Sequence, residues 1–388
     1  MQSSPLGESA MEIRIPFNRP FLLGGEFESM RDAFEGLTIS EGGPFTRQCE
    51  ELLQEVTGSP AVLLTSSCTH ALEMAALLLD LGPGDEVIVP SFTFTSTANA
   101  FAMRGARPVF ADIREDTLNL DEALLPPLVS ERTKAIVVVH YAGVACAMEP
   151  ILELASSEGI PLVEDNAHGL LASYRGVRLG LFGCLATQSF HETKNVTCGK
   201  GGALLVNDPS YLARAHVLRE KGTNRTQFTQ GLVDKYSWVD LGSSYLPPDI
   251  LSAFLLAQLR GRGRIQAARM RIWERYHQEL APWAEAQGVR QPVVPEGCEH
   301  PAHLYHLVLP DGDARNRFLA HLRAEGILAV FHYVPLHTSP MGRRLGGEPG
   351  DCPVTEAVSA RLVRLPFFTG MTEDDQGRVI EVVRSFRA

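Results

Sequence analysis

From about residue 60 onward, short apolar runs alternate with longer stretches in which apolar residues recur at helical spacing. The short runs are apolar at successive positions, which is typical of strands whose two faces are both covered. Strands that alternate with helices predict a mainly parallel α/β sheet. The runs are AVLL (61–64), DEVIVP (85–90), RPVFADI (107–113), KAIVVVHY (134–141), IPLVED (160–165), LATQSFH (185–191) and GGALLVND (201–208).

The same pattern divides the chain into three parts. Residues 1–14 show no such periodicity and are expected to form a loose leader. Residues 15–255 are predicted to form a large α/β domain, and residues 256–388 a smaller C-terminal α+β domain. A long helical stretch, 249–280, is expected to link the two domains.

Composition and charge exclude some classes of partner. The 388 residues carry a net charge of −11, so neither nucleic acid nor a membrane surface is an expected partner. No apolar run approaches the ~20 residues that a membrane span needs. Seven cysteines occur without a CxxC pair, which favours reduced thiols in a cytoplasmic protein over a disulfide framework.

Polar residues follow several predicted strands, and function in α/β proteins lies at these carboxyl ends. The segment SSCT (66–69) opens a helix, so its backbone N–H groups can bind an anion, although such residues more often serve as a plain N-cap. Asp165 ends a buried strand, where a carboxylate needs a cationic partner such as a protonated pyridine nitrogen. Asp is also common as a helix cap, so that alternative stays open.

Lys194 and Phe94 complete the set of candidates. Desolvation behind a buried strand lowers the pKa of a lysine and exposes a neutral amine, as imine formation requires, whereas most lysines are solvated. Phe94 can cover one face of a planar cofactor or belong to the core. Taken singly, each of these residues has a commoner structural interpretation. Their order along one sheet edge favours joint binding of a phosphate, a ring face, a ring nitrogen and an aldehyde.

Two further patterns suggest other chemistry. His300, His303 and His306 recur at a spacing of three, but on a strand-like run they point to alternate faces, so no metal site is predicted. Cys68 would open a helix, where a thiol can have a lowered pKa. We favour packing beside the anion as its role.

The motifs together resemble a known family. In order, they are SSCTHALEMAA, PSFTFTSTANA, HYAGVACAM, VEDNAHG, SFHETKN, GGALL, HYVPLH and LPF. They resemble the DegT/DnrJ/EryC1/StrS sugar aminotransferases, which have the fold of type I enzymes dependent on pyridoxal 5'-phosphate (PLP). LLTSSCT, LEMAALLLD, VHYAGVAC, FHETKN and REKGTNR look closest to the branch that makes dTDP-4-amino-4,6-dideoxygalactose from dTDP-4-keto-6-deoxyglucose. The chain is also similar to sugar 4-aminotransferases of antibiotic clusters.

The resemblance implies a role for individual residues. Lys194 would bind the cofactor as a Schiff base and carry the proton, with glutamate as amino donor and C4 of a dTDP-4-keto-6-deoxy sugar as acceptor. The family's sites lie between two subunits, so a homodimer is expected. The implied cofactor contacts are Ser67, Cys68, Thr69 and Ser189 at the phosphate, Phe94 on the ring and Asp165 at the ring nitrogen; His332 and Tyr333 are candidate substrate contacts.

The chain departs from the family pattern at three positions. His168 stands where glutamine is frequent beside the cofactor's ring oxygen, and its charge would depend on pH. Ser244 stands about where an asparagine reaches the partner subunit's cofactor phosphate, and a serine side chain reaches less far. Lys200 replaces the acid of a frequent GEGG motif.

Three rival functions remain open. The acceptor can be another keto sugar, such as a 3-keto hexose or a 4-keto pentose, because pocket shape decides this choice. Dehydratases of the family replace the Schiff-base lysine by histidine, so Lys194 argues for transamination. A catalytically silent regulatory protein on the same fold is the third alternative.

Overall fold

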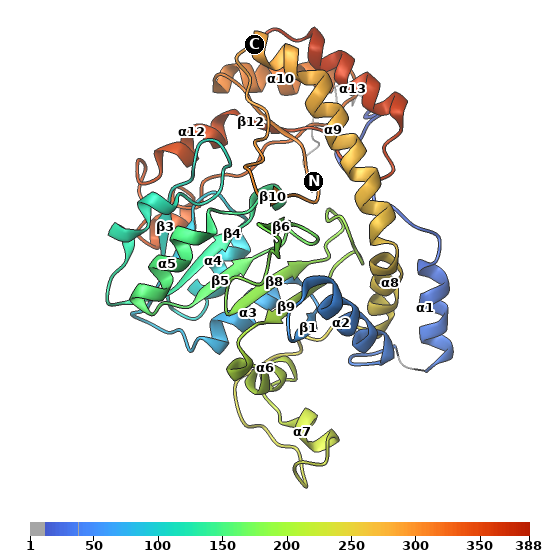
Figure 1. Cartoon of the computed structure of the whole chain (residues 1–388), viewed down its shortest axis with the longest axis vertical. Helices are drawn as coiled ribbons and strands as arrows, with labels where there is room; N and C mark the ends of the chain where they lie inside the picture. The colour runs from blue at the N-terminus through green and yellow to red at the C-terminus, as the bar shows by residue number, and fades with distance from the viewer. Residues whose placement is uncertain (1–11, 38) are drawn as a thin grey trace, which may run out of the picture.

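The computed structural model describes residues 12–37 and 39–388. Its centre is a seven-stranded sheet in the order β1-β9-β8-β5-β4-β2-β3 (Figure 1). Strands from β8 to β3 pair in parallel, whereas β9 is antiparallel to both β8 and β1, which confirms the predicted mainly parallel α/β class. The strands are β1 (Val62–Thr65), β2 (Glu86–Pro90), β3 (Arg107–Ala111), β4 (Thr133–Val139), β5 (Leu162–Asp165), β8 (Leu185–Ser189) and β9 (Gly202–Val206).

Helices cover both faces of this sheet, because successive strand residues point to opposite sides. In β2, Val87 and Val89 pack with α3 and α4 on one face, and Ile88 packs with α5 on the other. The second face is covered by α2 and α8 beside β1 and β9. The helices up to this point are α1 (Glu26–Glu35), α2 (Pro44–Thr57), α3 (Cys68–Leu78), α4 (Thr95–Ala102), α5 (Met148–Glu158), α6 (Leu212–Arg219), α7 (Arg225–Thr229) and α8 (Asp249–Arg260).

The C-terminal part is built around the long helix α9 and has its own core. Tyr276 and Trp283 of α9 pack with Phe318 of α10 and Val383 of α13. The remaining elements are α9 (Arg262–Ala286), α10 (Gly312–Ala324), α11 (Pro340–Arg344), α12 (Pro353–Arg361), α13 (Glu373–Ser385), the pair β11 (His306–Val308) and β12 (Leu362–Arg364), and the small sheet of β10 (Cys298–Glu299), β6 (Ser173–Tyr174) and β7 (Val177–Arg178).

The structure differs from the sequence-based expectation in the long helical stretch, and it describes only part of the expected leader. The helical stretch expected over 249–280 is two helices that meet at Gly261, where an added Cβ would collide with the side chain of Leu23. Residues 1–11 of the expected leader lie outside the described residues, whereas Ile15 pairs with Ile327 of the C-terminal part. The domain boundaries stay predictions. Of the helices that the structure describes, none has the length and apolar character of a membrane span.

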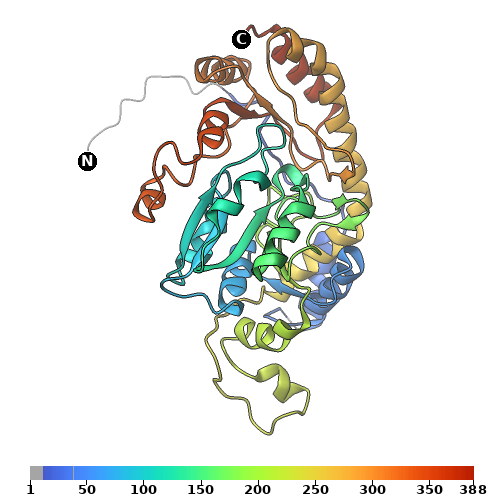
Figure 2. The same ribbon diagram turned by 60° about the vertical axis from the view of Figure 1, so that its left-hand side comes forward.

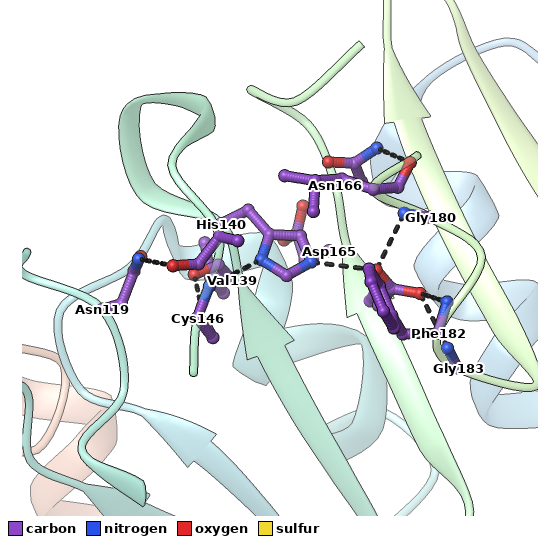
Figure 3. Close-up of polar contacts among 12 residues, drawn as sticks. Asn119, Val139, His140, Cys146, Asp165, Asn166, Gly180, Phe182 and Gly183 are labelled. Atoms are coloured by element: carbon purple, nitrogen blue, oxygen red, sulfur yellow. Dashed lines mark hydrogen bonds and ion pairs between the residues drawn. The ribbon is translucent and has the colours of Figure 1, made fainter. Parts of the chain in front are cut away.

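A buried carboxylate ties the ends of β4 and β5 to the loop 180–183 (Figure 3). Glu164 Oε1 accepts from the N–H groups of Phe182 (2.6 Å) and Gly183 (2.7 Å), and Oε2 accepts from Gly180 N–H (2.8 Å). His140 Nε2 lies 2.9 Å from the same Oε2, and both side chains are fully buried. Three amides and an imidazole therefore surround this one carboxylate, immediately before Asp165.

We expect Glu164→Gln to lower the free energy of unfolding by roughly 2–4 kcal/mol, because an amide NH₂ would face N–H donors that now share a carboxylate. Urea unfolding followed by circular dichroism measures this loss. Glu158→Gln, an exposed change at the end of α5, is the matched control and should leave stability unchanged. Equal stability of the two variants would contradict the organising role of Glu164.

Candidate active site

A cavity of about 370 Å³ lies at the carboxyl ends of the parallel strands, where elements of the C-terminal part cover them. It brings together segments that are far apart in the sequence, as expected for a site at strand ends. Of the residues that the sequence singles out, those lining it are Ser67, Cys68, Thr69, Phe94, Asp165, His168, Ser189, Lys194, His332 and Tyr333.

The start of helix α3 forms one wall of the cavity. Ser67 is the N-cap, and its side chain accepts from His70 N–H (3.1 Å), while the first-turn amides of Cys68 and Thr69 precede the first intrahelical hydrogen bond. Gly202 allows this turn to pack closely on β9, because a Cβ there would collide with the backbone of Ser67 and Cys68. The helix start and the hydroxyl of Ser189 together make a site suited to a phosphate.

Cys68 is a packing residue in this wall. Burial raises the pKa of its thiol to about 12, and its Sγ lies 3.4 Å from Thr187 Oγ1. The thiol therefore stays protonated, which favours packing over a reactive thiolate.

Asp165 lies at the end of β5 with its side chain buried against the cavity. Its Oδ2 accepts from Thr97 Oγ1 (2.7 Å), and its Oδ1 accepts from Ala167 N–H (3.2 Å). Burial raises the pKa of this carboxyl, and within the described part of the chain no lysine or arginine forms an ion pair with it. A cationic N–H group bound in the cavity would supply the missing partner.

Lys194 lies on the turn that follows β8, with its backbone N–H donating to His191 O (2.8 Å). Burial lowers the pKa of its amine to about 8, and Asp165 opposes part of this shift. The neighbouring residue anchors the turn, because Asn195 Nδ2 donates to Pro301 O (2.7 Å) and Asn195 Oδ1 lies 2.9 Å from His303 Nδ1. The structure therefore presents an amine with an increased neutral fraction to the cavity.

Two aromatic side chains border the same space. Phe94 is the N-cap residue of α4 and is 58% exposed, with its side chain on the cavity wall. Tyr333 packs edge-on against Phe92, with ring centroids 5.4 Å apart. Phe94 is thus available to cover one face of a flat ring.

His168 is neutral at physiological pH. Its Nδ1 accepts from Ala142 N–H (3.3 Å), and its ring stacks on His303 with centroids 4.2 Å apart. Burial and the nearby charge of Lys194 hold the pKa of His168 well below its usual value. With Nδ1 as acceptor, Nε2 carries the hydrogen, so this residue can donate a hydrogen bond in place of the family's glutamine without a pH-dependent charge.

The three regularly spaced histidines diverge. His300 packs against Trp273 (ring centroids 4.4 Å apart), His303 stacks on His168, and His306 lies edge-on to Tyr141 (5.7 Å). Over the described ranges, no group of three histidine, cysteine or acidic side chains is arranged to hold a metal ion.

Ser244 is the one predicted site residue that lies away from the cavity. Its Oγ donates to Glu41 Oε2 (3.1 Å), and the residue is exposed. Its expected contact is with a partner subunit's cofactor, so this role stays a prediction.

The cavity also contains residues that sequence reasoning did not assign to it. His303, Arg364 and Lys200 contribute to its walls. Lys200 is one of the three departures from the family pattern. Arg364 immediately precedes the LPF motif, and this position beside a family motif was the one signal in the sequence that could have identified it.

The donor set matches the chemistry of PLP. A helix start and Ser189 suit the phosphate, and Asp165 lacks the cation that a protonated ring nitrogen would supply. Lys194 suits the aldehyde, and Phe94 is available to the ring face.

The chain matches the model of the DegT/DnrJ/EryC1/StrS aminotransferase family over residues 24–384. It is 32% identical over 379 residues to the spore coat polysaccharide biosynthesis protein SpsC of Bacillus subtilis, which covers 95% of this chain and 96% of that protein.

Solved structures agree with this match. The aminotransferase TlmJ from Streptoalloteichus hindustanus is 31% identical and superposes with a TM-score of 0.87, covering 97% of this chain and 98% of that one. Spr1654 from Streptococcus pneumoniae, in its PLP form, is 26% identical with a TM-score of 0.88, covering 96% and 98%. A PMP form of the same protein is 27% identical with a TM-score of 0.89, covering 96% and 98%.

The family match spans nearly the whole chain, and the cavity holds the groups that the family's cofactor requires. The chain therefore belongs to the DegT/DnrJ/EryC1/StrS aminotransferase family and is a PLP-dependent sugar aminotransferase.

Proposed function

We propose that the enzyme transfers an amino group from glutamate to C4 of a dTDP-4-keto-6-deoxy sugar and forms dTDP-4-amino-4,6-dideoxygalactose. The main support for transamination is that the amine of Lys194 lies in one cavity with Asp165 and the start of α3. The choice of sugar is supported by the runs LLTSSCT, VHYAGVAC, FHETKN and REKGTNR, which resemble the corresponding branch of the family.

Different residues of the cavity would hold different parts of PLP. When bound, PLP supplies an electron sink that stabilises negative charge on the carbon that loses its proton. Asp165 keeps the ring nitrogen protonated, and the amides of Cys68 and Thr69 with Ser67 and Ser189 hold the phosphate. Phe94 restricts the ring from one face.

Lys194 has two tasks in this scheme. Its neutral amine would hold the cofactor covalently, and the free amine would carry a proton from and to the reacting carbon. His168 donates a hydrogen bond from Nε2 beside the ring. His332 and Tyr333, on the side of the cavity formed by the C-terminal part, contact the substrate.

We further infer that the active enzyme is a homodimer. The segment around α7 stands out from the rest of the molecule (Figures 1 and 2) and exposes large apolar side chains, with Trp238 77% exposed. Clustered exposed apolar groups mark an interaction surface, and a second copy would cover them. Ser244 lies close along the chain, which supports a role for it across that interface. The seven free thiols fit a reducing cytoplasm.

A panel of dTDP-keto sugars with glutamate tests the substrate. We expect the 4-keto-6-deoxy sugar to give the 4-amino product, identified by mass spectrometry and NMR. Amination of only a 3-keto hexose or a 4-keto pentose would contradict the proposed acceptor while leaving transamination intact.

Lys194→Ala should lower turnover at least about 10³-fold, because it removes both the covalent link and the proton carrier. Lys134→Ala, an exposed lysine of β4 that does not line the cavity, is the matched control and should retain the absorbance of the bound cofactor. Near-normal transamination by Lys194→Ala would refute the assigned role.

The lowered pKa of Lys194 gives a pH prediction for the cofactor-free enzyme. The rate at which added PLP becomes covalently bound should rise with pH through a midpoint near 8, because only the neutral amine reacts. The growth of near-visible absorbance after mixing measures this rate. A midpoint near the ordinary lysine value, above pH 10, would show that the amine is solvated instead.

A further inference from the structure

Arg364 is a half-buried cation of the cavity that none of the steps above uses. It ends β12, where it pairs with His306 of β11 on one side. On the other side its N–H donates to Val330 O (2.7 Å), and Val330 N–H donates to Arg364 O (3.1 Å). Strand pairing on both sides holds the backbone, so the guanidinium projects into the cavity from a rigid support.

The charge of Arg364 has no anionic partner among the described residues. No aspartate or glutamate forms an ion pair with it, and its Nε is buried without a hydrogen-bond acceptor. Its Nη2 donates only to Phe331 O, at 3.4 Å, while the ring of Phe17 lies 4.7 Å from its Cζ. Removing the Nε of a guanidinium from water in this way is costly unless something else supplies an acceptor.

Arg269 shows what a satisfied buried arginine looks like in the same chain. It also has no acidic partner among the described residues, but its donors reach Ala302 O (3.0 Å), His303 O (2.5 Å) and Thr369 Oγ1 (3.3 Å). Carbonyl and hydroxyl oxygens thus accept from the guanidinium of Arg269, whereas the guanidinium of Arg364 has only one protein acceptor among the described residues.

The groups around Arg364 are neutral. Burial, with a smaller contribution from the charge of Arg364, holds the pKa values of His303, His306 and His332 below the usual range. Burial raises the pKa of the Tyr141 and Tyr333 hydroxyls, so these stay protonated. No described side chain forms an ion pair with Arg364, which points to a ligand as the source of its anion.

We propose that Arg364 binds the carboxylate of the amino donor. This inference rests on the proposed function, since transamination needs an amino acid whose carboxylate is one bond from the carbon that loses its proton. That carboxylate must be enclosed close to Lys194, and a guanidinium fork matches its two oxygens. The diphosphate of a sugar nucleotide is separated from C4 by the sugar ring, so it lies farther from the reacting centre.

Binding of glutarate, a donor analogue without the amine, tests the site by isothermal titration calorimetry on the holoenzyme. We expect Arg364→Gln to weaken glutarate binding roughly 10- to 100-fold, the range for a charge-assisted hydrogen-bonded pair. Thymidine diphosphate, the probe for the other anion, should bind both proteins equally. In kinetics, KM for glutamate should rise while KM for the keto sugar stays unchanged.

Arg361→Gln is the matched control, because Arg361 is three residues away and pairs with Glu115 (3.6 Å) outside the cavity. It should leave glutarate binding unchanged. Wild-type enzyme that binds no glutarate, or Arg364→Gln enzyme that loses thymidine diphosphate but keeps glutarate, would overturn the proposal.

Arg364→Met separates ligand binding from a structural role. Because it removes a half-buried charge that has no ion-pair partner, it should melt no lower than the wild type and still lose glutarate. A variant that melts lower, or that melts normally and still binds glutarate, would overturn the proposal. The two proposals can fail separately. If the Arg364 variants lose glutarate but the wild type aminates no dTDP-4-keto sugar, the carboxylate site is supported and the proposed acceptor is rejected.

Discussion

Two adjacent carboxylates at the end of one buried strand set the conditions for the rest of the site. Glu164 and Asp165 are consecutive in β5, so they point to opposite sides of the sheet. Glu164 is surrounded by three amides and His140, and its charge is balanced within the protein. Asp165 has one hydroxyl and one amide, and it faces the cavity. The first carboxylate organises the strand ends, and the second is left for a ligand.

The sequence predicted those parts of the site that follow from strand periodicity. Asp165 and Lys194 come directly after buried strands, and the segment 66–69 lies between a strand and a helix, so the parallel sheet alone places them at one edge. The resemblance to the family then identified their common ligand. Each position had a commoner structural explanation, and Ser67 is indeed the N-cap of α3 while also lining the cavity.

The remaining parts depend on tertiary packing that no local pattern encodes. His303 and Arg364 come from the C-terminal part, more than a hundred residues after Lys194, and strand periodicity says nothing of which sheet edge they cover. An arginine at the end of a short strand is normally solvated, so the partial burial of Arg364 could not be foreseen. The break at Gly261 was missed because the apolar pattern continues on both sides, and only the close packing of the Leu23 side chain marks the position.

The two unbalanced charges of the cavity act on the same amine. Burial lowers the pKa of Lys194 most, and beyond that effect Asp165 raises the pKa and Arg364 lowers it. A cationic ring nitrogen beside Asp165 cancels the first influence, whereas an anion on Arg364 cancels the second. Occupation of the ring site therefore favours the neutral, nucleophilic amine. Arrival of a carboxylate at Arg364 makes the same amine a stronger base, at the stage when it must accept a proton.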